Sequence, residues 1–375
     1  MIDAVHQPLD TDLLPRGVRS RFVDNGNGLV MHVLEAGFEH SGRPCVLLLH
    51  GFPELAYSWR GVMPALADAG YHVIAPDQRG YGRTSGGDAR YDGDWRACRF
   101  LNLVRDAIGL LAALGVPSVH AVVGHDFGSP VAAWCALTRP EVFRSLVLMS
   151  APFPGLAAGG AAAKSGDVHA ALAALPRPRK HYQRYYTTRE ANDDMWRCAQ
   201  GVHDFLRAYY HHKSADWTAN KPFRLAGWSA DDLAKMPTYY VMDQHETMAQ
   251  TVAHEMPGAE QITACRWLPE RELRVYSGEY VRTGFQGGLQ WYRCAADAAC
   301  SAELQPFAGR TIDVPALFIA GRCDWGIHQN PGAFEAMQST ACTRWRGSHL
   351  IDGAGHWVQQ EQPAAVSRLL LEFMA

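Results

Sequence analysis

The chain has 375 residues, of which 47% are hydrophobic and 19% charged, and its formal net charge at pH 7 is −3. This balance excludes a disordered chain, which needs low hydrophobicity and high net charge, and it leaves no global basic field to attract nucleic acid. No apolar run reaches the roughly 18 residues of a membrane span.

The nine cysteines are an odd number, scattered from Cys45 to Cys342 without a C-x-x-C pair. This usage is typical of a reducing compartment, where cysteines act as small buried hydrophobes, rather than of a disulfide framework. The first residues, Met1 to His6, lack the basic and apolar regions of a signal peptide. We therefore expect a cytoplasmic protein.

The first 150 residues alternate short apolar runs with helical patterns. The runs are continuous, as in strands buried on both faces of a sheet, and they cover residues 45–50, 71–75, 119–123 and 146–149. Apolar residues recur every three or four positions over 101–111, before Gly115, and a second helix is expected over 129–138, before Pro140. Strands separated by helices predict an α/β fold with a mostly parallel sheet and helices on both faces.

This alternation stops at residues 151–155. The small residues of 156–164 predict a flexible connection, and 170–305 shows helical periodicity without a clear buried strand. A core strand is expected again over 314–321, and a last helix over 363–374, which begins with proline.

The simplest organisation is therefore one α/β core interrupted by a helical insertion. We expect the first part of the core over residues 1–151, the insertion over 152–305, and the second part of the core over 306–375.

The segment Gly124-His125-Asp126-Phe127-Gly128 lies between an apolar strand and a helix rich in small residues. It has the form of a nucleophile elbow, G-x-Nu-x-G, in which two glycines permit a tight strand-to-helix turn. The residue at the apex is Asp126 rather than serine or cysteine. A carboxylate at a helix N-terminus is ionised without help from a base and can attack carbon to form an ester. The alternative is an aspartate that only caps a helix.

Three other segments supply partners for Asp126. The loop after the first buried strand offers the amide of Phe52, which with the amide of Phe127 would form an oxyanion hole; the alternative for this loop is an ordinary X-Pro turn. Asp324 follows the late strand, and His356 lies between a glycine and a tryptophan. The chain order is the nucleophile, acid, histidine order of α/β-hydrolases, whose sites gather at the carboxyl ends of strands.

These residues make the chain resemble the α/β-hydrolase-fold epoxide hydrolases over nearly its whole length. The matching core segments are 50–53, 77–85, 124–128, Asp324 and 355–356. In the insertion, residues 283–293 resemble the cap motif G-F-x-G-P-L-N-W-Y-R, with Gly288 and Gln290 in place of Pro and Asn, and residues 181–186 resemble the cap motif Y-Q-x-Y-F. The resemblance implies an α/β-hydrolase fold with an inserted helical cap domain.

The cap motifs nominate Tyr292 and Tyr182 as the two phenols that open the epoxide ring. Tyr185 and Tyr186 are close enough in sequence to replace Tyr182 in that role. A neutral phenol, with a reference pKa of about 10, can bind the ring oxygen and deliver a proton as the C–O bond breaks. The alternative is that these rings only pack between helices.

The resemblance implies hydrolysis of an epoxide to a vicinal diol through a covalent ester on Asp126, with Asp324 and His356 activating water. It implies no cofactor and no metal, with a small-molecule epoxide and water as partners. The alternatives are a haloalkane dehalogenase using the same aspartate, which Phe127 disfavours because it replaces a halide-binding Trp, and a non-catalytic small-molecule receptor.

The sequence leaves the oligomeric state open, including a homo-oligomer, and assigns no role to Trp325. We expect His211 and His212 to be a solvated pair rather than a metal site.

Overall fold

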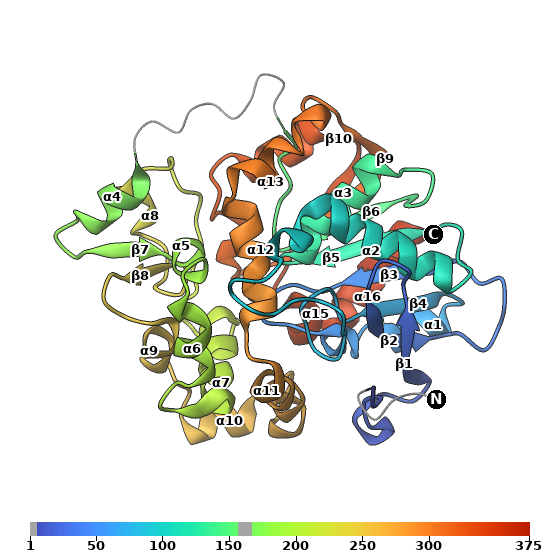
Figure 1. The fold of residues 1–375 in the computed structure, drawn as a ribbon, viewed down its shortest axis with the longest axis horizontal. Helices are drawn as coiled ribbons and strands as arrows, with labels where there is room; N and C mark the ends of the chain where they lie inside the picture. The colour runs from blue at the N-terminus through green and yellow to red at the C-terminus, as the bar shows by residue number, and fades with distance from the viewer. Residues whose placement is uncertain (1–5, 157–166) are drawn as a thin grey trace.

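The structure, a computed structural model, describes residues 6–156 and 167–375 (Figure 1). Its centre is an eight-stranded sheet with the order β1-β2-β4-β3-β5-β6-β9-β10. β2 pairs antiparallel with both of its neighbours, β1 and β4. All other neighbouring pairs in this sheet are parallel. The strands are β1 Val18–Asp24, β2 Val30–Ala36, β3 Cys45–Leu49, β4 His72–Pro76, β5 Ala121–His125, β6 Leu146–Met149, β9 Ile312–Gly321 and β10 Cys342–Ile351.

The four apolar runs of the first 150 residues form β3, β4, β5 and β6, which confirms the predicted parallel sheet. β5 begins two residues later than predicted, because Val119 makes only an isolated bridge with Phe143. β1 and β2 were not predicted. β2 is almost wholly buried but contains His32 and Glu35, so it lacks the continuous apolar signature of the central strands.

Helices form layers around this sheet. α2 and α3 pack together against it, and α1 packs against α16 and β4. The core helices are α1 Met63–Asp68, α2 Phe100–Ala113, α3 Gly128–Thr138, α14 Ala333–Ala336, α15 Val358–Glu361 and α16 Pro363–Met374. The predicted helices are confirmed as α2, α3 and α16. Within the two described ranges, no helix combines the length and apolar character needed to cross a bilayer.

Between β6 and β9 the chain leaves the sheet and forms the helical insertion, which lies beside the core (Figure 1). Its helices are α4 Val168–Ala173, α5 Tyr182–Tyr186, α6 Glu190–Trp196, α7 Gly201–Lys213, α8 Ala230–Leu233, α9 Met248–Ala253, α10 Ala259–Ala264, α11 Glu270–Thr283, α12 Gln286–Ala296 and α13 Ala298–Ala302.

The expectation that the insertion contains no strand was wrong. β7 Arg179–His181 and β8 Val241–Asp243 form a small antiparallel sheet. Strands of three residues are too short to show a periodicity in the sequence. The flexible connection predicted over 156–164 lies outside the described residues from position 157 onward.

Candidate active site

Asp126 occupies a strained turn between β5 and α3. Its φ angle is 51°, in the left-handed region, where a non-glycine residue costs roughly 1–3 kcal/mol. A Cβ atom at Gly124 would collide with the carbonyl oxygen of Gly128, and one at Gly128 would collide with that of Leu49. The two glycines of the motif therefore allow α3 to pack directly on the sheet, and the turn carries the Asp126 side chain beyond the strand end.

Both carboxylate oxygens of Asp126 have partners. Oδ1 accepts a hydrogen bond from the Phe52 amide at 2.9 Å, and Oδ2 lies 3.2 Å from Nε2 of His356. Burial raises the pKa of Asp126, but the bond and charge of His356 and the ammonium of Lys213 outweigh burial and hold that pKa well below its usual range. The side chain is therefore an ionised carboxylate, as the predicted nucleophile must be, and Oδ1 already occupies half of the predicted oxyanion hole.

Within the described residues, the amide of Phe127 donates no recorded hydrogen bond. It belongs to the N-cap residue of α3, where helical N–H groups lack intrahelical acceptors. It is thus available as the second donor of the oxyanion hole.

His356 and Asp324 complete the group around the nucleophile. Nδ1 of His356 lies 3.0 Å from Oδ1 of Asp324, which also accepts the Gly326 amide at 2.7 Å. Burial and the Lys213 ammonium lower the pKa of His356, but the two aspartates raise it further, so the net shift is upward. The structure thus brings together three residues that are up to 230 positions apart.

Glu361 stabilises the loop that carries His356 through hydrogen bonds to the backbone. The sequence analysis did not identify this residue. Its Oε2 accepts the amides of Gly355 at 2.9 Å and Ala215 at 2.8 Å, and its Oε1 accepts the amide of Trp357 at 3.0 Å. Glu361 therefore holds the backbone on both sides of His356 and joins it to the insertion. The sequence contains no usable signal for it, because a glutamate four residues after Trp357, the N-cap residue of α15, does not fit a capping box.

A second missed feature is a buried pair behind the elbow. Glu54 and His125 are fully buried, with Oε2 of Glu54 2.6 Å from Nδ1 of His125. Nε2 of His125 donates to the carbonyl of His356 at 2.7 Å. His125 lies in the elbow motif and Glu54 directly follows the segment 50–53, and together they connect the Phe52 loop, the elbow and the histidine loop.

Lys213, the last residue of α7, was also missed. It is 3% exposed, and its ammonium lies 5.0 Å from the ring centroid of Tyr240 and 5.3 Å from those of Tyr209 and Trp357. Its carbonyl accepts the His356 amide at 2.9 Å. This buried cation stabilises the negative charge of Asp126. No pattern in the sequence distinguishes it from an ordinary C-terminal helix lysine.

The two predicted phenols lie close enough to Asp126 for its charge to act on both. The ring of Tyr292 packs edge-on against Phe127 at 5.0 Å and Phe52 at 5.6 Å, the residues whose amides are the predicted oxyanion donors. The ring of Tyr182 lies 6.0 Å from that of Tyr292. Burial and then the charge of Asp126 raise the pKa of Tyr182 well above its usual value. Burial, Tyr182 and Asp126, in that order, do the same to the pKa of Tyr292, so both phenols remain protonated.

The neighbouring tyrosines have other partners. The Tyr185 hydroxyl donates to Asp194 at 2.8 Å, and the buried Tyr186 hydroxyl donates to Tyr209 at 3.3 Å. The Tyr182 hydroxyl instead donates to Oε1 of Gln329 at 3.2 Å, on the loop that follows Asp324. This geometry favours Tyr182 over its two neighbours as the second acid.

A close backbone contact places the helix of Tyr292 on the core. Figure 1 shows α12 between the rest of the insertion and the sheet. A Cβ at Gly80 would lie 2.6 Å from the carbonyl oxygen of Gly287, and one at Gly287 would collide with Gly80. The Trp291 indole donates to the Arg79 carbonyl at 2.9 Å. The core motif 77–85 and the cap motif 283–293 are therefore two halves of one interface.

A cavity of about 490 Å³ opens beside these residues. It is lined from the core by Phe127, Ala151 and Gln329 and from the insertion by Gln183 and Tyr292. It thus reaches both a predicted oxyanion donor and a predicted acid, and its volume suits a small organic molecule.

Two remaining expectations concern residues outside this group. His211 and His212 are not solvated, because they are 8% and 0% exposed; the ring of His212 packs 4.4 Å from that of Trp217. Trp325 is buried and packs 5.0 Å from the ring of Phe223. Across residues 6–156 and 167–375, no group of three or more His, Cys, Asp or Glu side chains could hold a metal ion.

Comparisons with known proteins agree with this geometry. The model of the alpha/beta hydrolase fold family matches residues 44–363. The chain is 34% identical to epoxide hydrolase A of Mycobacterium tuberculosis (strain ATCC 25618 / H37Rv) over 94% of this chain and 96% of that protein. An epoxide hydrolase from an endophytic Streptomyces has a TM-score of 0.76 at 30% identity, with 96% of each chain covered. Potato (Solanum tuberosum) epoxide hydrolase I has a TM-score of 0.73 at 28% identity, with 95% of this chain and 99% of that chain covered.

Proposed function

Because this chain belongs to the α/β-hydrolase-fold family and is an epoxide hydrolase, which confirms the resemblance seen in its sequence, we propose a two-step mechanism on Asp126. The observation that carries the proposal is the pair of contacts at its carboxylate. One oxygen accepts the Phe52 amide at 2.9 Å, and the other lies 3.2 Å from His356. Each oxygen is thereby given a different task.

In the first step, Oδ2 of Asp126 attacks an epoxide carbon while Oδ1 stays on the Phe52 amide and becomes the ester carbonyl. The electrons of the breaking epoxide C–O bond go to its oxygen, to which Tyr182 and Tyr292 both donate hydrogen bonds, and one of the two phenols transfers its proton. Such general acid help is worth about 10² to 10⁴ in rate. The product is a hydroxyalkyl ester, and one phenol is left as a phenolate.

In the second step, His356 removes a proton from water, and Asp324 stabilises the imidazolium. The resulting hydroxide attacks the ester carbonyl carbon, and the amides of Phe52 and Phe127 hold the oxyanion; each such donor is worth about 10² to 10³. The ester C–O bond breaks, and the diol oxygen takes the proton from His356. The remaining proton of the water returns to the phenolate, so epoxide and water give only the diol.

The domain limits and the compartment are also proposals. We propose a core formed by residues 1–151 and 306–375 and a cap formed by 152–305, supported by the helices α4 to α13 that separate β6 from β9. The proposed partners are a small-molecule epoxide and water. All nine cysteines are free thiols, which supports a cytoplasmic location that cell fractionation can test.

A single turnover in H₂¹⁸O with excess enzyme tests the ester mechanism. The expected result is an unlabelled diol and ¹⁸O in the peptide that contains Asp126, because the hydroxide attacks the carbonyl carbon. Asp126→Ala should give neither diol nor labelled peptide. The mechanism is refuted if the first diol carries the label and the peptide does not. A chloroalkane serves as a control substrate, since halide release would favour the dehalogenase alternative.

A further inference from the structure

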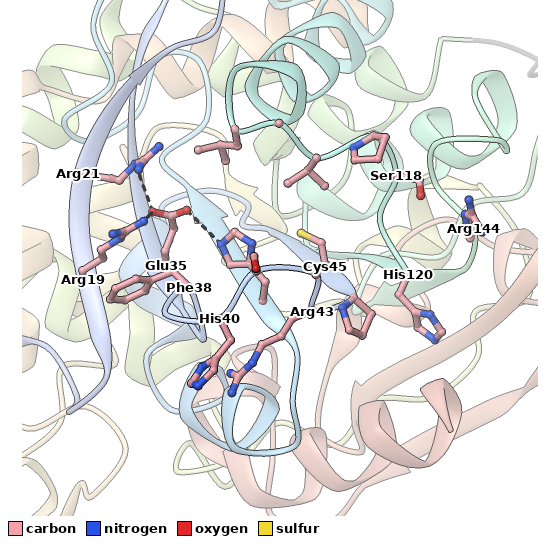
Figure 2. Close-up of a pocket in the computed structure, with 18 residues that line it drawn as sticks. Arg19, Arg21, Glu35, Phe38, His40, Arg43, Cys45, Ser118, His120 and Arg144 are labelled. Atoms are coloured by element: carbon pink, nitrogen blue, oxygen red, sulfur yellow. Dashed lines mark hydrogen bonds and ion pairs between the residues drawn. The ribbon is translucent and has the colours of Figure 1, made fainter.

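A second cavity lies at the end of the sheet opposite the catalytic residues (Figure 2). Its volume is about 610 Å³, and its lining includes Cys45, where β3 begins, and His72, where β4 begins. Phe52 and Asp126 instead follow the carboxyl ends of β3 and β5. The five residues of β3 span about 16 Å at roughly 3.3 Å per residue, so the two sites are separate.

The wall of this cavity is basic, although the chain as a whole is acidic. Four arginines and one carboxylate line it, whereas the net charge of the chain is −3. These residues are Arg19, Arg21, Arg43, Arg144 and Glu35. With the lining histidines counted as neutral, the wall carries three net positive charges.

The single carboxylate is already engaged inside the wall. Glu35 is 1% exposed; its Oε2 accepts Nε of Arg19 at 3.0 Å and lies 3.2 Å from Nε of Arg21, and its Oε1 lies 3.1 Å from Nε2 of His72. Burial raises the pKa of Glu35, but His72 and the two arginines outweigh burial and lower it. Its negative charge is therefore matched locally and does not neutralise the rest of the cavity.

Arg43 and Arg144 have no such partner. In the part of the chain that the structure describes, neither forms an ion pair with a carboxylate. Nη1 of Arg43 donates to the Ala67 carbonyl at 3.1 Å, which fixes the guanidinium without neutralising it. Arg144 is exposed, and Figure 2 shows it beside Ser118 and apart from Arg43. Two guanidinium groups thus reach one cavity from different loops.

We propose that this cavity is a second, non-catalytic binding site for a small oxyanion that carries at least two negative charges. Guanidinium groups match the planar oxygen pairs of phosphates and carboxylates, and their bonds to anions are stronger than neutral ones. Because Arg43 is held by a backbone carbonyl and Arg19 by Glu35, less side-chain freedom is lost on binding than at a mobile surface cluster.

Isothermal titration calorimetry with inorganic pyrophosphate and with citrate tests this site. The wild-type chain should bind at least one of these anions saturably at a one-to-one ratio, and added salt should weaken the affinity. Pyrophosphate alone would identify phosphates as the ligand class, citrate alone carboxylates, and both would identify multiply charged oxyanions in general. Arg43→Gln/Arg144→Gln should weaken binding by at least about tenfold, since two bonds to charged groups are lost.

The matched control is Arg346→Gln, because Arg346 is exposed on β10 and does not line the cavity. It should bind as the wild type does, and all variants should keep epoxide hydrolysis, which reports that they are folded. Arg144→Gln alone, at an exposed position, keeps the test decisive if the double variant is unstable. Absence of saturable binding to the wild type, or equal affinity in the wild type and the cavity variants, would overturn the proposal.

Discussion

Replacing His356 by glutamine should separate the two chemical steps. In the wild type, Nε2 of His356 lies 3.2 Å from Asp126, and Nδ1 lies 3.0 Å from Asp324. Glutamine cannot take a proton from water at neutral pH. The Phe52 amide at 2.9 Å and the buried Lys213 ammonium still favour the ionised form of Asp126. We therefore expect ester formation to survive and ester hydrolysis to fail.

The expected size of the effect follows from the role of the base. Loss of a positioned general base costs about 10² to 10⁴ in the step that it assists. His356→Gln should consume about one equivalent of epoxide per active site and then turn over slower than the wild type by that factor. The first step should slow much less, because Asp126 loses only one of its stabilising neighbours.

Rapid quenching with diol analysis measures the burst, and intact-protein mass spectrometry detects the stalled ester as a mass increase equal to that of the substrate. Asp126→Ala provides the control, because it should show neither burst nor adduct. The assignment of His356 as the base fails if His356→Gln turns over repeatedly at the wild-type rate without accumulating an adduct.

Three other outcomes are expected. Tyr182→Phe and Tyr292→Phe should each slow the single-turnover burst by about 10² or more. Tyr185→Phe should change the burst little, because the Tyr185 hydroxyl binds an aspartate outside the site. Equal losses in all three variants would contradict the choice of acids. Glu361→Gln disturbs three hydrogen bonds from backbone amides around the histidine loop. It should lower kcat more than it raises KM, and it should reduce the free energy of unfolding by about 1–3 kcal/mol in urea denaturation. Unchanged kcat would refute the positioning role of Glu361. The pKa of His356 is raised in the free enzyme by the charge of Asp324 and by the hydrogen bond to the Asp126 carboxylate, and the ester lacks that carboxylate. The rate of ester hydrolysis falls at acid pH when His356 becomes protonated. The apparent pKa of this fall should therefore be lower than the pKa of His356 measured by NMR in the free enzyme. Equal values would argue against an effect of Asp126 on the pKa of His356.

Local chemistry explains why much of the fold and of the candidate site could be predicted from the sequence. The strands β3, β5 and β6 are continuous apolar runs because both of their faces are buried, and such runs need no knowledge of their neighbours. The elbow at Asp126 was equally visible, because its pattern of two glycines around the apex fits within five residues, although Gly128 is required by a contact with Leu49 of β3. Chain order then placed Asp324 and His356 after the nucleophile.

Elements whose sequence mixes polar and apolar residues in no clear pattern could not be predicted. β2 is buried yet contains His32 and Glu35, because these side chains find partners in other segments, Asp77 and His72 among them. The strands of the insertion are too short for a pattern. Glu361 and Lys213 look like ordinary helix residues until the backbone of the His356 loop is folded against them.

The sequence by itself determined the fold class, the elbow and the order of the proposed catalytic residues, since each follows from spacing within a short segment or from the succession of segments. Only the tertiary structure decided what each tyrosine hydroxyl meets, because Tyr182 and Tyr185 are one helical turn apart, yet the first donates to Gln329 of the core and the second to Asp194 of the insertion. It also decided that arginines from separate loops share one cavity at the far end of the sheet. Distances between remote segments are set by packing, and no local pattern encodes them.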